Sequence, residues 1–312
     1  MTTASATQAI PLIDLSDLDD NAVQQTDTAC REVGFVRLTG HGVSPDLIDR
    51  AFEVSRIFFD SPQRVKKACT RQGSFLGYHG PDTLRASTTS TGPRDRKATY
   101  AVGRELDEGE RCTEFTPPNA WPAGMPEVRN TLSAYYEAMH HLSVRVSNLF
   151  ALALGLPANH FRQSLHRHLS WLTSIDYPKG GRRLRPDQMR FGEHRDRGLL
   201  TILASSAEGL EVRGDDGCWY PVPADPHNLI VNVGSMLANW TGRRWVSPLH
   251  RVRPPLAGEG RRQSLVFFTN PNPATFLTPL PLPGTTELPL WAGPPRTVGD
   301  YLASMLSLYA HA

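Results

Sequence analysis

Residues 194–204 read HRDRGLLTILA, a stretch in which two potential metal ligands precede a run typical of a buried β-strand. The run at residues 199–204 is short, apolar and rich in Leu, which favours a strand over a surface loop. Where a chain is extended, residues i and i+2 point to the same face. His194 and Asp196 are therefore expected to converge, with Arg195 on the opposite face and out of the site. The competing interpretation is an exposed polar turn before the strand.

Outward from this stretch, the chain after residue 168 has the pattern of a β-rich unit. Gly, Pro, Asp and Asn separate short runs of strand-forming residues at 170–177, 209–213, 219–222, 229–233, 249–252 and 264–268. Many short strands at close spacing are typical of a β-sandwich or β-barrel. The C-terminal half is therefore predicted to form a barrel or jelly roll.

The N-terminal half has helical spacing for most of its length. Residues 10–15 (IPLIDL) predict a short edge strand, and residues 34–38 predict a second strand. Apolar residues at helical intervals predict helices at 21–33, from about 45 to 59, at 125–154 and, near the end of the chain, at 298–309. Gly155 and Pro157 are expected to end the long helix.

Residues 71–120 break both patterns, because they are rich in Gly, Ser, Thr, Pro and charge around one strand-like run at 98–102. Long connections inside compact domains often serve as lids. We interpret residues 1–312 as one α+β domain. Its N-terminal region extends to about residue 120 and includes this variable loop. A helix, the β core and a C-terminal helix follow from about residue 121 to 312.

The composition excludes several classes of protein. Apolar residues make up 39% of the 312, charged residues 21%, and the net charge is +2, so no strongly charged partner is demanded. Basic and aromatic residues are not interleaved, and nucleic-acid binding is therefore not expected. The longest apolar run, residues 149–156, is far shorter than the ~20 residues of a membrane helix.

The cysteines and the first residues bear on the cellular compartment. Residues 1–9 lack the basic start and long apolar region of a signal peptide. The cysteines are isolated from one another: Cys30, Cys69, Cys112 and Cys218. Isolated cysteines without a secretory signal predict reduced thiols and a cytoplasmic location. The sequence carries no signal for an oligomeric state.

A second histidine, His250, lies 54 residues after Asp196 in the strand-like run PLHRV at 248–252. Two histidines and one carboxylate on a rigid β framework could form a facial triad. Such a triad suits Fe(II) and leaves positions open for substrate and dioxygen. A His-x-Asp pair alone is a weak signal, and a hydrogen-bonded strand histidine is the alternative for His250.

Arg262 and Ser264 add a second element to the predicted site. They begin a strand-like run and share one face of it by the same i, i+2 rule. A Pro- and Gly-containing turn separates them from His250, so we expect the two flanking strands to lie side by side. A guanidinium and a hydroxyl together bind a carboxylate well. The alternative is a surface arginine within a basic stretch.

The order His194-x-Asp196, His250, Arg262-x-Ser264 resembles that of the Fe(II)/2-oxoglutarate-dependent oxygenases of the isopenicillin N synthase-like family. Further stretches are similar to the same family: LIVNVG at 229–234, NWTG at 239–242, SPLHRV at 247–252, IPLIDL at 10–15, GFV at 34–36 and GHGV at 40–43. The resemblance covers roughly residues 10 to 309.

The resemblance implies a double-stranded β-helix (jelly roll) with flanking helices. It implies that His194, Asp196 and His250 ligate Fe(II), and that Arg262 and Ser264 hold the distal carboxylate of 2-oxoglutarate. Tyr177 matches the second Tyr of the family's Asn-Tyr-Tyr-Pro stretch, which often touches this cosubstrate. Here Ile175 and Asp176 replace the Asn and the first Tyr, which puts one cosubstrate contact in doubt.

The implied reaction is oxidative decarboxylation of 2-oxoglutarate to succinate with dioxygen, coupled to oxidation of a small molecule. The outcome can be hydroxylation, desaturation or ring formation. The abundance of Arg over Lys suggests, by association, a GC-rich bacterium and natural-product (antibiotic) biosynthesis.

Three alternatives remain open at this point. The first is an oxidase of the same family that uses Fe(II) and dioxygen without 2-oxoglutarate, its Arg-x-Ser pair binding a substrate carboxylate. The second is a non-catalytic ligand-binding protein on the same fold. The third is a zinc hydrolase, since two His and one Asp also bind zinc.

Residues 71–120, Trp171, Phe268 and His79 are the candidates for contacts with the substrate. The run 179–190 carries five basic residues against one Asp just before the metal motif. We interpret it as a solvated loop, with a lid that attracts an anionic or polar substrate as the alternative. His166 and His168 also have i, i+2 spacing but lack the rest of the motif, so a structural or solvent-exposed position is expected.

Overall fold

The computed structural model describes residues 10–84, 93–178, 188–283 and 296–309, with side chains described to residue 303. The larger sheet contains β1 (Leu12–Asp14), β2 (Phe35–Thr39), β3 (Gly77–His79), β4 (Ala98–Gly103), β5 (Trp171–Tyr177), β7 (Leu200–Ser205), β10 (Leu229–Val233) and β12 (Arg262–Thr269). The smaller sheet contains β6 (Phe191–His194), β8 (Leu210–Arg213), β9 (Trp219–Pro221) and β11 (His250–Val252). A separate pair is formed by β13 (Phe276–Leu277) and β14 (Arg296–Thr297).

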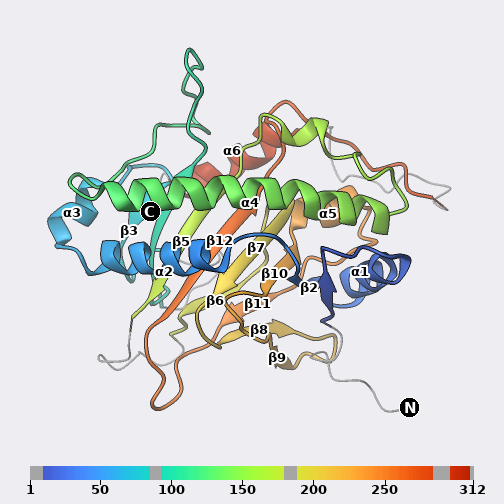
Figure 1. The fold of residues 1–312 in the computed structure, drawn as a ribbon, viewed down its shortest axis with the longest axis horizontal. Helices are drawn as coiled ribbons and strands as arrows, with labels where there is room; N and C mark the ends of the chain where they lie inside the picture. Colours follow the sequence, from blue (N-terminus) through green and yellow to red (C-terminus); the bar gives the residue numbers. More distant parts are fainter. Residues whose placement is uncertain (1–9, 85–92, 179–187, 284–295, 310–312) are drawn as a thin grey trace.

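The two sheets face each other and form the double-stranded β-helix that the sequence resemblance implies (Figure 1). The larger sheet has the order β1-β2-β10-β7-β12-β5-β4-β3, and the smaller one β6-β11-β8-β9. The N-terminal strands therefore complete both edges of a sheet whose centre comes from the C-terminal half.

The helices are α1 (Asp20–Glu32), α2 (Pro45–Asp60), α3 (Gln63–Ala68), α4 (Pro126–Ala153), α5 (Ser235–Trp240) and α6 (Val298–Tyr309). Local chemistry explains their ends. The Asp19 carboxylate accepts the backbone N–H of Ala22 at 2.7 Å and so caps α1. Gly155 follows α4 with φ +76°, a conformation that favours glycine, and the helix stops there as the sequence predicts.

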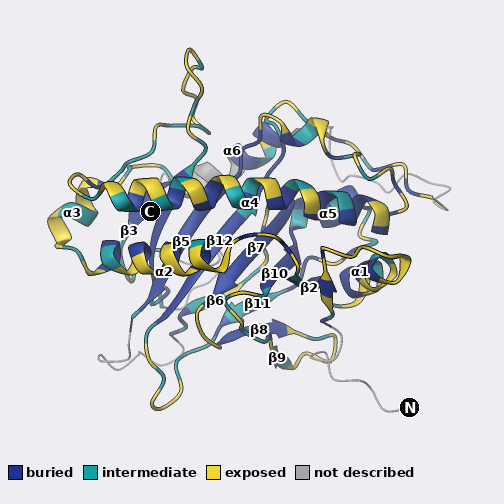
Figure 2. Ribbon diagram, viewed as in Figure 1, coloured by how far each residue is buried: buried dark blue, intermediate teal, exposed yellow. Residues whose placement is uncertain are grey.

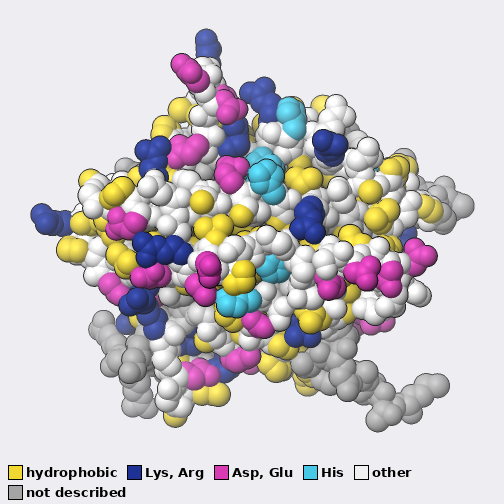
Figure 3. Space-filling view, viewed as in Figure 1, with side chains coloured by type: hydrophobic (Ala, Val, Ile, Leu, Met, Phe, Trp, Pro, Cys, Tyr) yellow, Lys and Arg dark blue, Asp and Glu magenta, His cyan; other side chains and the backbone are white. Residues whose placement is uncertain are grey.

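Helices α2 and α4 lie across one face of the larger sheet (Figure 1). Their sheet-facing sides are buried and their outer sides exposed (Figure 2). Acidic and basic side chains are interspersed on this helical face of the molecule (Figure 3). No helix in the described ranges has both the length and the hydropathy needed to span a membrane.

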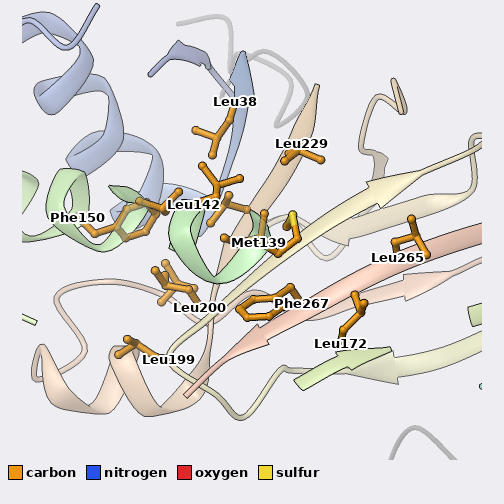
Figure 4. Packing of buried hydrophobic residues seen from close by; sticks show 14 of the residues in the cluster. Leu38, Met139, Leu142, Phe150, Leu172, Leu199, Leu200, Leu229, Leu265 and Phe267 are labelled. Carbon is orange, nitrogen blue, oxygen red and sulfur yellow. The ribbon is translucent and has the colours of Figure 1, made fainter. Parts of the chain in front are cut away.

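The main core lies between these helices and the larger sheet. Met139, Leu142 and Phe150 of α4 face apolar side chains of the strands, among them Leu265 and Phe267 of β12 (Figure 4). Because alternate strand residues face opposite sides, Arg262, Ser264, Val266 and Phe268 of the same strand face the space between the two sheets. One strand thus builds the hydrophobic core with one face and the candidate site with the other.

Truncating Phe267 is expected to destabilise the protein strongly. Its side chain is 0% exposed, and Phe267→Ala removes it from a packed core, so we expect the free energy of unfolding to fall by about 3–5 kcal/mol. Phe276→Ala is the matched control, because Phe276 is 60% exposed. Urea denaturation of both variants checks this, and equal midpoints would contradict it.

One expectation about the sheets is wrong. The strands on either side of the turn at residues 253–261 do not lie side by side, because β11 pairs with β6 and β8 whereas β12 pairs with β5 and β7. Facing sheets pack about 10 Å apart, so the intervening chain is long enough to pass from one sheet to the other. His250 and Arg262 therefore approach each other across the interior. The sequence also did not predict β3, β6, α3 or α5.

Candidate metal centre and adjoining cavities

Three side chains from the smaller sheet meet at one point. His194 is the last residue of β6, Asp196 follows two residues later, and His250 begins β11 directly opposite His194. One ligand atom from each lies within 4.8 Å of the others, the only such cluster of three His, Cys, Asp or Glu side chains found among the described residues. The Nε2 atoms of His194 and His250 both lie 3.7 Å from Oδ1 of Asp196.

Backbone carbonyls orient both imidazoles. Nδ1 of His194 lies 2.8 Å from the carbonyl oxygen of Gly192, and Nδ1 of His250 lies 3.1 Å from that of Pro248. A carbonyl oxygen only accepts, so each Nδ1 carries the proton and donates it. The Nε2 lone pairs are then free to face the common point, as in metal-binding histidines.

Asp196 is held by its other oxygen. Its Oδ2 accepts hydrogen bonds from Thr201 Oγ1 at 2.6 Å and Asn232 Nδ2 at 2.8 Å. Burial by itself would raise the pKa of Asp196, but the facing imidazoles and these two hydrogen bonds outweigh it and lower that pKa. Burial also lowers the pKa of His194. An ionised carboxylate beside a neutral imidazole is the protonation state that a divalent metal requires.

Loss of the Asn232 hydrogen bond is expected to weaken metal binding by about 10–100-fold. Asn232→Leu keeps the volume but releases Oδ2 of Asp196, so the carboxylate loses its fixed orientation. Titration with Mn(II), followed by the electron paramagnetic resonance of the free ion, measures the affinity. Asn159→Leu, at an exposed position, is the control. Equal affinities for the two variants would show that Asn232 does not orient the ligand.

A buried cation lies close to this cluster. Arg262 is 1% exposed and donates from Nη1 to Ser264 Oγ and from Nη2 to Ser205 Oγ, both at 2.6 Å. Its guanidinium carbon lies 4.9 Å from the centre of the Tyr177 ring. No carboxylate of the described residues forms an ion pair with it. Because an isolated buried charge is costly, this arginine calls for an anionic ligand.

A cavity of about 40 Å³, here called the Arg262 cavity, lies between the metal cluster and the Arg262 side chain. Its wall includes His194, Asp196, His250, Arg262, Ser264 and Tyr177. The structure thus brings together all six residues that the sequence singled out for metal and cosubstrate. Ser205, Thr201 and Asn232 were missed, because only the pairing of β7 with β12 and β10 brings them to this place.

A second cavity of about 150 Å³ also has His194 and Asp196 in its wall. We call it the aromatic cavity, because Phe75, Trp171, Phe191 and Phe268 line it. The ring centres of Trp171 and Phe75 are 4.4 Å apart, and those of Trp171 and Phe268 are 5.1 Å apart. Trp171 and Phe268 therefore line a cavity next to the metal cluster, and their contact with a substrate stays a prediction.

Lys97 is a cationic wall residue of the aromatic cavity that the sequence did not indicate. It is buried, and its Nζ lies 3.3 Å from Oδ2 of Asp95. Burial lowers the pKa of Lys97 to about 8, although Asp95 opposes this shift.

One other expectation needs correction, that for Arg195, whereas a substrate contact of His79 stays a prediction. His79 lies on β3, paired with Thr99 of β4, and is not among the described residues that line either cavity. Arg195 is not out of the site: Arg195 and Arg197 both contribute to the wall of the aromatic cavity. The reason is that β6 ends at His194, so the alternation of an extended strand does not continue through Arg195.

Other basic and histidine candidates lie elsewhere. In the basic run, residues 179–187 are outside the described residues. His168 stacks on His140 of α4, with ring centres 3.8 Å apart, and so packs against the helix as a structural residue.

Comparison with known proteins agrees with this geometry. Residues 10–124 match a family model described as the non-haem dioxygenase in morphine synthesis N-terminal region, and residues 162–271 match the model of the 2OG-Fe(II) oxygenase superfamily. Validamycin A dioxygenase of Streptomyces hygroscopicus subsp. limoneus is 32% identical over 300 residues, covering 89% of this chain and 81% of that protein.

The chain also superposes on solved structures of proteins that were determined with 2-oxoglutarate bound. Full-length Neurospora crassa T7H in complex with alpha-KG superposes with a TM-score of 0.83 at 26% identity, over 96% of both chains. A complex of JOX2 with 2OG, Fe and JA superposes with a TM-score of 0.79 at 30% identity, over 95% of this chain and 85% of that one.

Proposed function

The chain belongs to the 2OG-Fe(II) oxygenase superfamily and is a 2-oxoglutarate- and Fe(II)-dependent oxygenase, and from this premise we propose that it hydroxylates, desaturates or cyclises a small molecule in bacterial natural-product biosynthesis. The similarity to validamycin A dioxygenase and the Arg-rich composition support the natural-product setting. A cytoplasmic location belongs to the same proposal, supported by four free cysteines.

In this proposal His194, Asp196 and His250 hold the iron. Their donor set, two imidazole nitrogens and one carboxylate oxygen, is that of a facial triad for non-haem Fe(II). Bound Fe(II) supplies the activation of dioxygen, coupled to conversion of 2-oxoglutarate to succinate and carbon dioxide. The chain's own contribution is to fix the two imidazole tautomers and to keep the Asp196 carboxylate ionised and oriented.

The single observation that carries the cosubstrate assignment is the buried Arg262, which has no carboxylate partner among the described residues. A dicarboxylate with one end at the metal cluster would satisfy it with its other end. Ser264, Ser205 and Tyr177 surround the same guanidinium and would position that carboxylate.

The departure from the family pattern at residues 175 and 176 leaves this anion site intact. Ile175 faces both cavities as an apolar wall. Asp176 faces the opposite side of β5, where it forms an ion pair with Arg261. The contact that the family's Asn would provide is therefore absent, while Arg262 and the hydroxyl groups of Ser264 and Ser205 remain.

The test needs no knowledge of the substrate. Under anaerobic conditions Fe(II) and 2-oxoglutarate together are expected to give a weak visible charge-transfer band, and admission of dioxygen is expected to release succinate slowly. An oxidase that uses no 2-oxoglutarate would give neither. Absence of both signals would reject the proposed function.

A further inference from the structure

We propose that the substrate of this oxygenase carries a carboxylate on a flat, apolar body, and that Lys97 binds this carboxylate in the aromatic cavity. The inference rests on the proposed function and specifies its substrate class. It follows from the charge of the cavity wall, the environment of Lys97 and the arrangement of the aromatic rings.

The wall of the aromatic cavity has an excess of positive charge. Lys97, Arg195 and Arg197 line it, Lys97 being buried and the two arginines exposed to solvent, and Asp196 is the one acidic residue among its described lining residues. Asp196 is already engaged, since Oδ2 accepts two hydrogen bonds and Oδ1 faces the imidazoles. No ion pair of Arg195 or Arg197 with a described carboxylate is seen. A wall of this charge attracts an anion and disfavours a cation.

Lys97 is built into the wall and is not a flexible surface lysine. The residue is 6% exposed. Its Nζ contacts Oδ2 of Asp95 at 3.3 Å and lies over the Phe191 ring, 2.6 Å from the ring centre. Asp95 is fixed in turn, because its Oδ1 accepts the backbone N–H of Gly192 at 2.9 Å.

This environment leaves binding capacity on the ammonium group. A lysine ammonium has three N–H donors. Asp95 and the Phe191 ring account for two of these donors, and no other acceptor for Lys97 is found among the described residues. Phe191 also stacks on His194, with ring centres 3.9 Å apart, and Lys97, His194 and Asp196 line the same cavity, so the ammonium group and the metal cluster border one space. A substrate carboxylate bound there would hold its neighbouring carbons near the reactive centre.

The aromatic rings determine the rest of the ligand. The ring of Trp171 is tilted against Phe75 and stacks on Phe268, and together these rings give the cavity an apolar aromatic wall that suits a flat ligand. The volume of about 150 Å³ corresponds to about ten water-sized positions at roughly 15 Å³ each. A monocarboxylate with about ten non-hydrogen atoms therefore fits both the size and the chemistry.

The probe is 3-phenylpropanoate, and its neutral counterpart is 3-phenylpropanamide. Each is titrated into the anaerobic protein with Fe(II) and saturating 2-oxoglutarate, and the change in the visible charge-transfer band is followed. We expect the carboxylate to bind at least tenfold more tightly than the amide. Lys97→Met is expected to remove this difference while leaving amide binding unchanged. Lys97→Arg retains the charge and is expected to preserve part of the preference.

Lys67→Met, an exposed lysine on α3, is the matched control and should behave as the unmodified protein. Equal binding of carboxylate and amide, no binding of either probe, or a preference that survives Lys97→Met would each overturn the inference. The inference would also be overturned if the probe abolished the band and additional 2-oxoglutarate restored it. The probe would then compete with 2-oxoglutarate for the Arg262 cavity. If the band does not form before any probe is added, the proposed function itself has failed.

Discussion

Asp196→Ala is expected to abolish the visible charge-transfer band of the anaerobic Fe(II)–2-oxoglutarate complex. Removal of a residue that only orients a ligand typically costs 10–100-fold in metal affinity or activity, so loss of the ligand itself should cost more than about 100-fold. Two imidazoles would remain, and the hydrogen-bond donors Thr201 and Asn232 would face an empty space. The band, Mn(II) affinity and succinate release should all fall together.

Asp17→Ala is the matched control, because Asp17 is exposed and belongs neither to the cluster nor to the cavity beside it. The metal-free forms of both variants should unfold at similar temperatures, which separates loss of the ligand from loss of the fold. A band that persists in Asp196→Ala would show that Asp196 does not ligate the iron.

Arg262→Gln is expected to raise the dissociation constant of 2-oxoglutarate by at least about 30-fold. Truncating one partner of a buried charge pair typically costs 2–5 kcal/mol, and the lower end of this range corresponds to that factor. The metal ligands are untouched, so Mn(II) binding should change little. The dependence of the charge-transfer band on 2-oxoglutarate concentration measures the effect.

The neighbouring Arg261→Gln provides a stringent control. Arg261 lies one residue away but faces the other side of β12, where it binds Asp60 and Asp176. It should leave the affinity for 2-oxoglutarate unchanged and affect only stability. If both variants lost the cosubstrate equally, a general disturbance of β12 would explain the result, and Arg262 would not be the specific anion site.

The sequence alone predicted most of the regular elements and the family. The spacing of apolar residues in α4 and the Gly155 stop depend only on near neighbours, so local pattern determines them. The jelly roll and the dependence on Fe(II) and 2-oxoglutarate were implied by the resemblance of the ordered motif to a known family, and the family comparisons confirm both. The proximity of His194, Asp196 and His250 was likewise expected from that motif.

Local pattern was insufficient where the chain departs from regular structure. The four-residue strand β6 contains Gly192 and Glu193 and gives no strand signal of its own. Because it stops at His194, the alternation rule misplaced Arg195, which belongs to the aromatic cavity. The same rule correctly separated Arg261 from Arg262, since β12 remains extended through both.

Chain periodicity therefore determined which side chains share one face of a strand, and tertiary structure decided which faces meet. Asn232 and Thr201 reach Asp196, Ser205 reaches Arg262, and Lys97 reaches the cavity only because strands distant in sequence close into two facing sheets. The free energy of that closure comes from burying apolar surface across the whole core. No short stretch of sequence contains this information, so the site's hydrogen-bonding partners became visible only in the folded chain.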